Sequence, residues 1–72
     1  MTLTVTFDRE HDGRVIAAVD ELPGVHVYGA TEEDALGKVQ ALALSVLSDE
    51  IAHGERDPKT LMTVTFTTAR AA

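Results

Sequence analysis

The sequence of 72 residues has no cysteine and no tryptophan, and its aromatic residues are two phenylalanines and one tyrosine. The absence of cysteine excludes disulfide bonds and metal sites built on thiolates. A single domain of this size buries only roughly 60% of the surface that its unfolded chain exposes, so its own core is marginal. Domains this small commonly gain stability from disulfides, a metal or association with another chain.

Positive charge is also scarce. Six Lys and Arg residues stand against twelve Asp and Glu residues, which gives a formal net charge of −6. Direct binding to nucleic acid requires clustered cations that neutralise phosphates, so we predict no direct nucleic-acid contact. A basic partner is the natural inference, although a modest negative charge also simply keeps a small protein soluble.

Long hydrophobic runs are absent as well. No stretch approaches the roughly 18 apolar residues that a membrane helix requires, and the N-terminus has no positive flank followed by an apolar segment. We therefore predict a cytoplasmic protein that does not associate with membranes.

Alternating side chains predict a strand near each end of the chain. Residues 3–7 and residues 62–66 both alternate apolar side chains with threonine. Between them, residues 14–19 are apolar on both faces, which is typical of a central strand, and residues 25–28 alternate again. The sequence thus predicts four strands.

One long helix is predicted between the third and fourth strands. Thr31 is a good N-cap, and residues 32–34 are acidic, where the helix dipole favours anions. The helical pattern continues to His53, and Gly54 supplies a C-terminal stop. A helix of about 22 residues is about 33 Å long, whereas strands of five to seven residues span roughly 20 Å, so we expect the helix to extend beyond its sheet.

The apolar residues of this helix cover an arc of about 200°, much wider than the roughly 100° that one contact surface requires. We assign four of them to the domain's own sheet: Leu36, Val39, Ala43 and Val46. Three are candidates for contact with a second copy of the chain, in a dimer or tetramer: Leu44, Leu47 and Ile51. The alternative is that the loop over residues 54–60 folds back over these three.

Chemical motifs are few. Residues 8–13 open like a calcium-binding loop, but the twelfth position, which must supply a bidentate Glu, is Val19. No two of the three histidines have the i, i+4 spacing of a metal-binding pair on a helix. No Ser or Thr has a nucleophile context, and no glycine-rich phosphate loop is present. We predict no catalytic, metal-binding or cofactor-binding residue and no enzymatic activity.

A family resemblance rests on residues 12–36, which read DGRVIAAVDELPGVHVYGATEEDAL. This order of hairpin turn, strand, Leu-Pro-Gly turn, strand and capped helix resembles the HicB-like antitoxin domain, whose members usually read like DGGYVAYVPELPGCVSQGDTLEEAL. Val25 replaces the frequent cysteine, and the glycine-aromatic pair after Gly13 is missing. The resemblance extends from about Leu3 to the Asp57-Pro58 turn and fits the closing strand.

The resulting expectation is one α+β domain over residues 1–72, with the two-layer order β-β-β-α-β and one helix on one face of a mixed four-stranded sheet. A crossover through the helix allows the last strand to lie beside and parallel to the first, in the order 3-2-1-4. The family resemblance supports this order and implies a partial ribonuclease-H-like fold. It implies no nuclease chemistry, because the predicted first and last strands carry no acidic side chain for a two-metal site.

The resemblance further implies an antitoxin of a type II toxin-antitoxin system that binds and neutralises a small, basic, messenger-RNA-cleaving toxin of the HicA type. HicB-like antitoxins often add a C-terminal DNA-binding domain. This chain ends directly after its last strand, so we expect no DNA binding from it. The residues predicted to contact the partner lie on the outer sheet face: Ile16, Ala18, His26 and Tyr28.

Two other functions are compatible with the sequence. One is a stand-alone homo-oligomeric interaction module whose wide helix face pairs with itself. The other is a small-molecule sensor with a cleft near Tyr28, which has a single aromatic residue in its favour.

Overall fold

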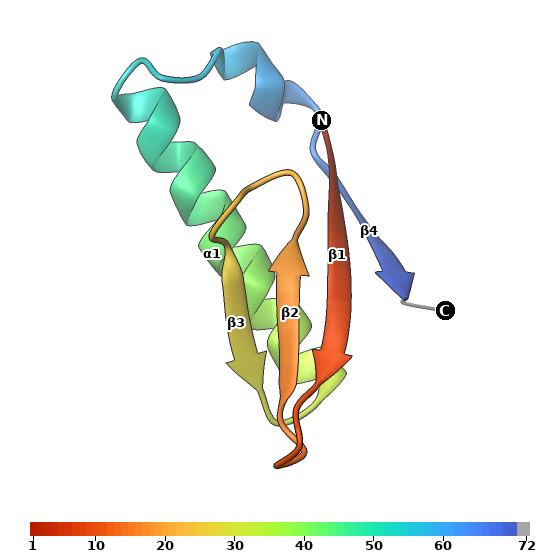
Figure 1. The fold of residues 1–72 in the computed structure, drawn as a ribbon. Helices are drawn as coiled ribbons and strands as arrows, with labels where there is room; N and C mark the ends of the chain where they lie inside the picture. Colours follow the sequence, from red (N-terminus) through yellow and green to blue (C-terminus); the bar gives the residue numbers. More distant parts are fainter. Residues whose placement is uncertain (71–72) are drawn as a thin grey trace.

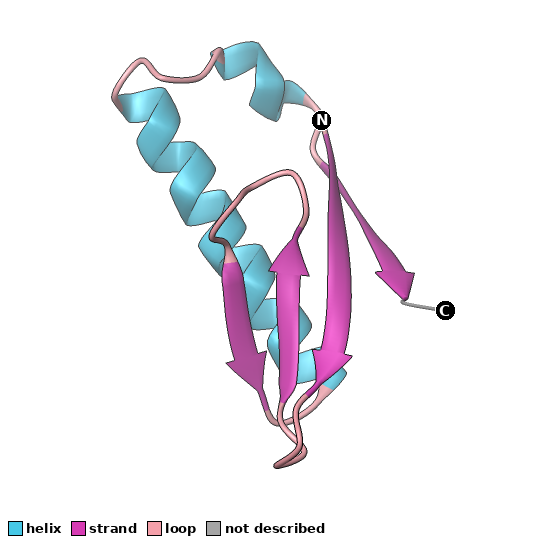
Figure 2. Ribbon diagram, in the orientation of Figure 1, coloured by secondary structure: helices cyan, strands magenta, loops and turns pink. Residues whose placement is uncertain are grey.

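The computed structural model describes residues 1–70 and shows three strands, a long helix, a short 3-10 helix and a final strand (Figure 1). The elements are β1 (Thr2–Arg9), β2 (Val15–Val19), β3 (His26–Gly29), α1 (Glu32–Ala52), η1 (Pro58–Met62) and β4 (Thr65–Arg70). In Figure 2 the strands form one layer and α1 lies across one face of it.

The strand order is β3-β2-β1-β4. β1 pairs antiparallel with β2, β2 pairs antiparallel with β3, and β4 lies parallel to β1 with Leu3 opposite Phe66. The predicted α+β class, the strand order and the parallel pairing of the last strand with the first are confirmed. The finer likeness to a ribonuclease-H fold stays a prediction.

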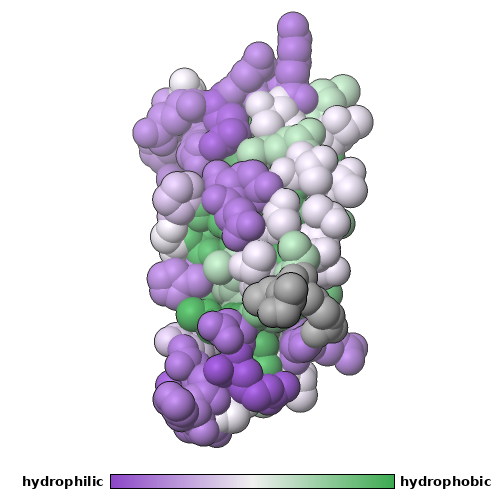
Figure 3. Space-filling model, turned by 45° about the vertical axis from the view of Figure 1, so that its right-hand side comes forward, coloured by the Kyte–Doolittle hydropathy of each residue, from purple (hydrophilic) through white to green (hydrophobic). Residues whose placement is uncertain are grey.

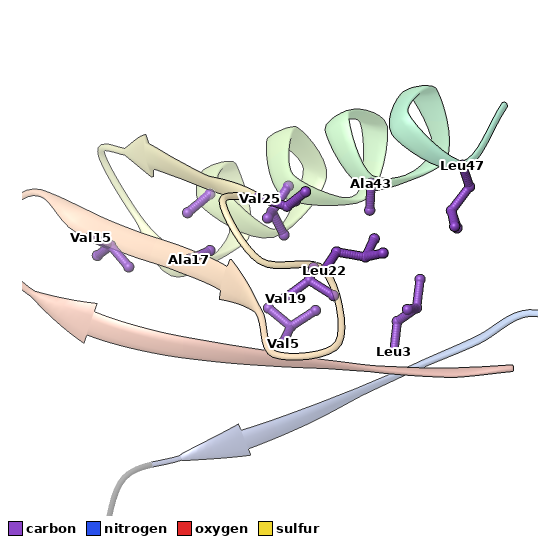
Figure 4. Close-up of a cluster of buried hydrophobic side chains, with 11 residues drawn as sticks. Leu3, Val5, Val15, Ala17, Val19, Leu22, Val25, Ala43 and Leu47 are labelled. Atoms are coloured by element: carbon purple, nitrogen blue, oxygen red, sulfur yellow. The ribbon is translucent and has the colours of Figure 1, made fainter. Parts of the chain in front are cut away.

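The core lies between α1 and the sheet (Figure 4). Its buried side chains are Leu3, Val5, Val15, Ala17, Val19, Leu22, Val25, Ala35, Val39, Ala43 and Leu47. Along β2 the burial alternates as predicted, so that the odd-numbered residues face the helix and Ile16 and Ala18 face away from it. The pleat of the sheet thus gives each strand a helix-covered inner face and an outer face.

Both ends of α1 follow the prediction. The Thr31 hydroxyl accepts a hydrogen bond from the Asp34 amide at 3.1 Å, and the Asp34 carboxylate accepts one from the Ala30 amide at 3.0 Å. His53 is the C-cap, and Gly54 follows with a φ of +70°, a left-handed conformation that glycine adopts without strain. These contacts satisfy backbone groups that a helix end leaves unpaired.

Leu47 is a correction to the predicted oligomer interface, because it is fully buried within a single chain. It continues the buried stripe of α1 at four-residue spacing from Ala43. Figure 4 shows Leu3, near the start of β1, pointing toward Leu47. The sheet therefore extends under a part of the helix that we expected to be free.

The other two interface candidates keep some surface. Leu44 is 44% exposed, and Ile51 is partly buried. The loop after α1 is tied to the helix through the ion pair between Arg56 and Glu50, whose atoms lie 2.9 Å apart. This loop leaves Leu44 uncovered.

The last strand begins later than predicted. Met62 belongs to η1 and is 80% exposed, and β4 starts only at Thr65. Asp57 caps η1 by accepting a hydrogen bond from the Lys59 amide at 3.0 Å, and Pro58 occupies its first position, where its missing N–H costs nothing. The prediction of a strand over residues 62–66 was wrong at its start because this cap was not considered.

Candidate partner-binding face of the sheet

The outer face of the sheet brings together the four residues predicted to contact a partner. Ile16 of β2 lies opposite Tyr28 of β3, and Ala18 lies opposite His26. Ile16 and Ala18 are partly buried, whereas His26 and Tyr28 are exposed. The predicted placement of these side chains on one face is therefore confirmed, and their role as contacts stays a prediction.

A shallow groove of about 300 Å³ runs over β1 and β2 on this side. Its lining residues are Thr6, Phe7, Asp8, Ile16 and Ala18. The contribution of β1 was missing from the sequence prediction. It follows from the strand register, which sets Thr6 opposite Ala18 and Asp8 opposite Ile16. An antiparallel hairpin between the first two strands, taken together with their alternation, would have indicated it.

Acidic side chains lie at one end of the groove. The Glu21 carboxylate accepts hydrogen bonds from the Thr4 amide at 2.6 Å and from the Thr4 hydroxyl at 2.7 Å. The amide hydrogen bond is the main reason why the pKa of Glu21 is lowered. Next to it, the Asp20 carboxylate accepts a hydrogen bond from the Thr6 hydroxyl at 3.3 Å. Glu21 therefore stays ionised in a fixed position beside the outer face.

The opposite end, near β3, holds a cation that already has partners. The Arg14 guanidinium lies 4.4 Å from the centre of the Tyr28 ring and forms an ion pair with Asp12 at 2.7 Å. The Arg14 amide lowers the pKa of Asp12, and its guanidinium adds to the effect. The Tyr28 hydroxyl in turn donates to Glu10 at 3.4 Å. Arg14 thus contributes little net positive charge to the face.

A second hollow, of about 290 Å³, lies beside Tyr28 near the start of α1. It is lined by Arg14, Tyr28, Gly29, Ala30, Asp34 and Lys38. Lys38 pairs with Asp34 at 3.1 Å, and the pKa of Asp34 is lowered mainly by the Ala30 amide and further by Lys38. The charges around this hollow are therefore matched among themselves and leave no cation or anion aimed at a ligand.

One cluster of possible metal ligands was missed by the sequence analysis. Asp49, His53 and Glu55 at the C-terminal end of α1 offer ligand atoms that lie within 4.8 Å of one another. The i, i+4 spacing of Asp49 and His53 was the available signal, and only pairs of histidines were considered. All three side chains are exposed, and the His53 ring already hydrogen-bonds to the Asp49 carbonyl at 2.7 Å. The C-cap of the helix accounts for this geometry.

The outer face can therefore offer apolar contact bordered by fixed negative charge. Among residues 1–69, whose burial the structure describes, no polar or charged side chain is buried. Comparison with protein-family models, with curated proteins and with solved structures finds no match to this chain. In the part of the chain that the structure describes, α1 and η1 are not apolar and long enough to cross a lipid bilayer.

Proposed function

We propose that this protein is a HicB-like antitoxin that binds and neutralises a small, basic, messenger-RNA-cleaving toxin of the HicA type. The observation that carries the proposal is the outer face of the sheet, where an apolar groove is bordered by acidic side chains. Ile16 and Ala18 form its floor, and Asp8, Asp20 and Glu21 supply negative charge around it.

Charge supports a basic partner. The chain carries a net charge of −6, and Arg14, which lies over the Tyr28 ring, is paired with Asp12. Electrostatic complementarity of this kind accelerates encounter with a cationic partner and disfavours acidic ones. A toxin that cleaves messenger RNA needs a basic surface to hold the phosphates, so an acidic protein that covers this surface would block it.

The order of elements supports the same proposal. A hairpin, a Leu-Pro-Gly turn and a capped helix occur in the order typical of HicB-like domains, and residues 12–36 carry the resemblance. The role requires binding and no catalysis, and it places the protein in the cytoplasm, where its target acts.

The test is co-expression with any small basic protein encoded next to this one, followed by affinity pull-down and a growth assay. We expect a stable complex and relief of toxicity. The double variant Asp8→Lys/Asp20→Lys should weaken binding. The control Glu33→Lys/Glu55→Lys makes the same change in net charge at exposed positions away from the groove and should bind almost as well as the wild type. Equal loss in the two variants would mean that overall charge, and not this face, carries the interaction.

A further inference from the structure

The groove over β1 and β2 has the size of a single side chain. Its volume is about 300 Å³, which is only the lower limit for a pocket that buries a drug-sized ligand. In its floor, Ala18 carries a single methyl group and lies opposite Thr6, and the next outward residue of β2 is Ile16. Both β2 residues are partly buried. One long side chain of a partner protein suits this space better than a cofactor.

The carboxylate of Asp8 borders the groove on the side of the β1–β2 hairpin, where Asp8 lies opposite Ile16. It accepts a hydrogen bond from the Arg9 amide at 2.8 Å, which holds the carboxylate in one orientation. Within residues 1–70, the carboxylates in ion pairs are those of Asp12, Asp34, Asp49 and Glu50. Asp8 is therefore an exposed, oriented anion without a cation of its own chain.

An apolar floor beside a carboxylate selects an occupant with an apolar stem and a cationic end. Figure 3, which brings the β4 side of the molecule forward, shows hydrophobic residues in a band between more hydrophilic ends, so both kinds of surface lie close together on this small domain. Arginine and lysine side chains have this composition, because their methylene stems cover apolar surface while the charged end stays near water.

The shape of the site favours arginine over lysine. A guanidinium is planar and weakly hydrated, and it donates two parallel hydrogen bonds to one carboxylate, whereas an ammonium is a compact and strongly hydrated charge. A planar group also lies flat in a shallow groove. Next to the groove, the chain already holds its own Arg14 guanidinium between the Tyr28 ring, at 4.4 Å, and the Asp12 carboxylate, at 2.7 Å. Asp8 offers a similar arrangement to a guanidinium from outside.

We propose that the groove receives one arginine side chain of the basic partner, with its stem on Ile16 and Ala18 and its guanidinium on the Asp8 carboxylate. The contact rests on the proposed function for the identity of the partner. It goes beyond that function because it names the side chain that the partner must present.

The experiment is an NMR titration of the full chain with end-blocked glycine peptides that carry one central arginine, lysine or citrulline. Citrulline keeps the shape of arginine and lacks its charge. We expect saturable shifts of the Ile16 and Ala18 methyl signals with the arginine peptide, with a dissociation constant on the order of millimolar. The lysine peptide should bind about fivefold more weakly or worse, and the citrulline peptide should give no saturable shift.

Two variants separate the floor of the groove from its charge. Ala18→Leu fills the groove without a change in charge and should abolish binding of the arginine peptide, whereas Ala41→Leu makes the same change at an exposed position of α1 and should leave it unaltered. Asp8→Asn keeps the shape of the side chain and should weaken binding by about tenfold. Because Asp8 is exposed, this variant should keep the wild-type circular dichroism spectrum.

Equal affinity for the arginine and lysine peptides, or undiminished binding to Ala18→Leu, would overturn the proposal. The same variants in the co-expression test separate this contact from the function itself. A toxin complex that Ala18→Leu does not weaken would keep the antitoxin function and reject the arginine contact. Saturable binding of the arginine peptide without any toxin complex would keep the contact and reject the function.

Discussion

Gly29 at the end of β3 lies in close contact with the first turn of α1. A Cβ atom at this position would lie 2.5 Å from the Ala35 amide nitrogen and 2.9 Å from a carboxylate oxygen of Asp34. These atoms belong to the first turn of the helix, and the backbone nitrogen cannot yield without moving α1. The glycine therefore allows the helix to start close against the strand.

We predict that Gly29→Ala lowers the free energy of unfolding by about 1–3 kcal/mol, the usual cost of overpacking. Gly37→Ala is the control. A Cβ at Gly37, on the exposed side of α1, meets no atom within 4 Å, and alanine is favoured there by about 1 kcal/mol through helix propensity. Urea denaturation should thus give opposite signs for the two variants, and equal signs would contradict this account.

The hydrogen bonds of Glu21 with Thr4 predict how stability depends on pH. The pKa of Glu21 lies below its ordinary value of 4.5 in the folded protein, mainly because the Thr4 amide donates to the carboxylate. A lowered folded-state pKa stabilises the protein above pH 4.5, and this contribution is lost as the pH falls through the folded-state pKa.

We therefore expect Glu21→Gln to be less stable than the wild type near neutral pH, with a difference that is constant down to about pH 5 and shrinks as the pH falls further. Asp12 and Asp34 also have lowered pKa values, but they are present in both proteins, so the comparison isolates Glu21. Denaturation curves at several pH values provide the measurement, with Glu55→Gln as control. A difference that is constant with pH would mean that the loss is steric and not electrostatic.

At the scale of elements, α1 carries one leucine in the core and another at the surface. Leu47 is fully buried, whereas Leu44, three residues earlier, is 44% exposed. The same substitution at the two positions thus compares a core site with a surface site in identical chemistry.

Leu47→Ala is expected to lower the free energy of unfolding by about 3 kcal/mol, from lost burial and the cavity left beside Leu3. Leu44→Ala should change it by less than about 0.5 kcal/mol. Thermal and urea denaturation measure both. If Leu44→Ala had the larger effect, the helix would be rotated from the orientation described here.

Elements were predictable from the sequence where local signals agree with one another. The cap at Thr31, the stop at Gly54 and the alternation of β2 each have a local physical cause, and all three are confirmed. The contact of Leu47 with Leu3 was not predictable, because it depends on where α1 crosses the sheet, which no local pattern fixes. The start of β4 depends on a capped 3-10 turn and on pairing with Thr2, whose partner is Thr65.

The sequence predicted which side chains lie on the outer face of the sheet. It did not predict the acidic side chains that border this face. Period-two alternation placed Ile16 and Tyr28 on the outer face. The position of Glu21 over Thr4 depends on the turn between β2 and β3, which no pattern along the chain specifies.

At the scale of the whole molecule, the uneven distribution of charge predicts how a complex would respond to salt. The outer face of the sheet is bordered by Asp8, Asp20 and Glu21, so ionic strength should affect the binding of a basic partner there. Binding of a basic partner should slow by about tenfold or more between low salt and about 0.5 M salt, because screening weakens electrostatic steering.

Stopped-flow kinetics at several salt concentrations measure this effect. Partner binding that is insensitive to salt would argue against the acidic border as its determinant.

The pairing of β4 with β1 also bears on how the chain acquires its structure. The Met1 ammonium donates to the Thr63 carbonyl at 2.8 Å, and the Thr65 amide donates to the Met1 carbonyl at 2.9 Å, so the two ends of the domain meet. Contacts this distant along the chain form slowly, because a long loop must close first. During synthesis, β1 is made first and receives its second neighbour last. Until residues 65–70 have left the ribosome, β1 remains an open strand edge on which another nascent chain can pair.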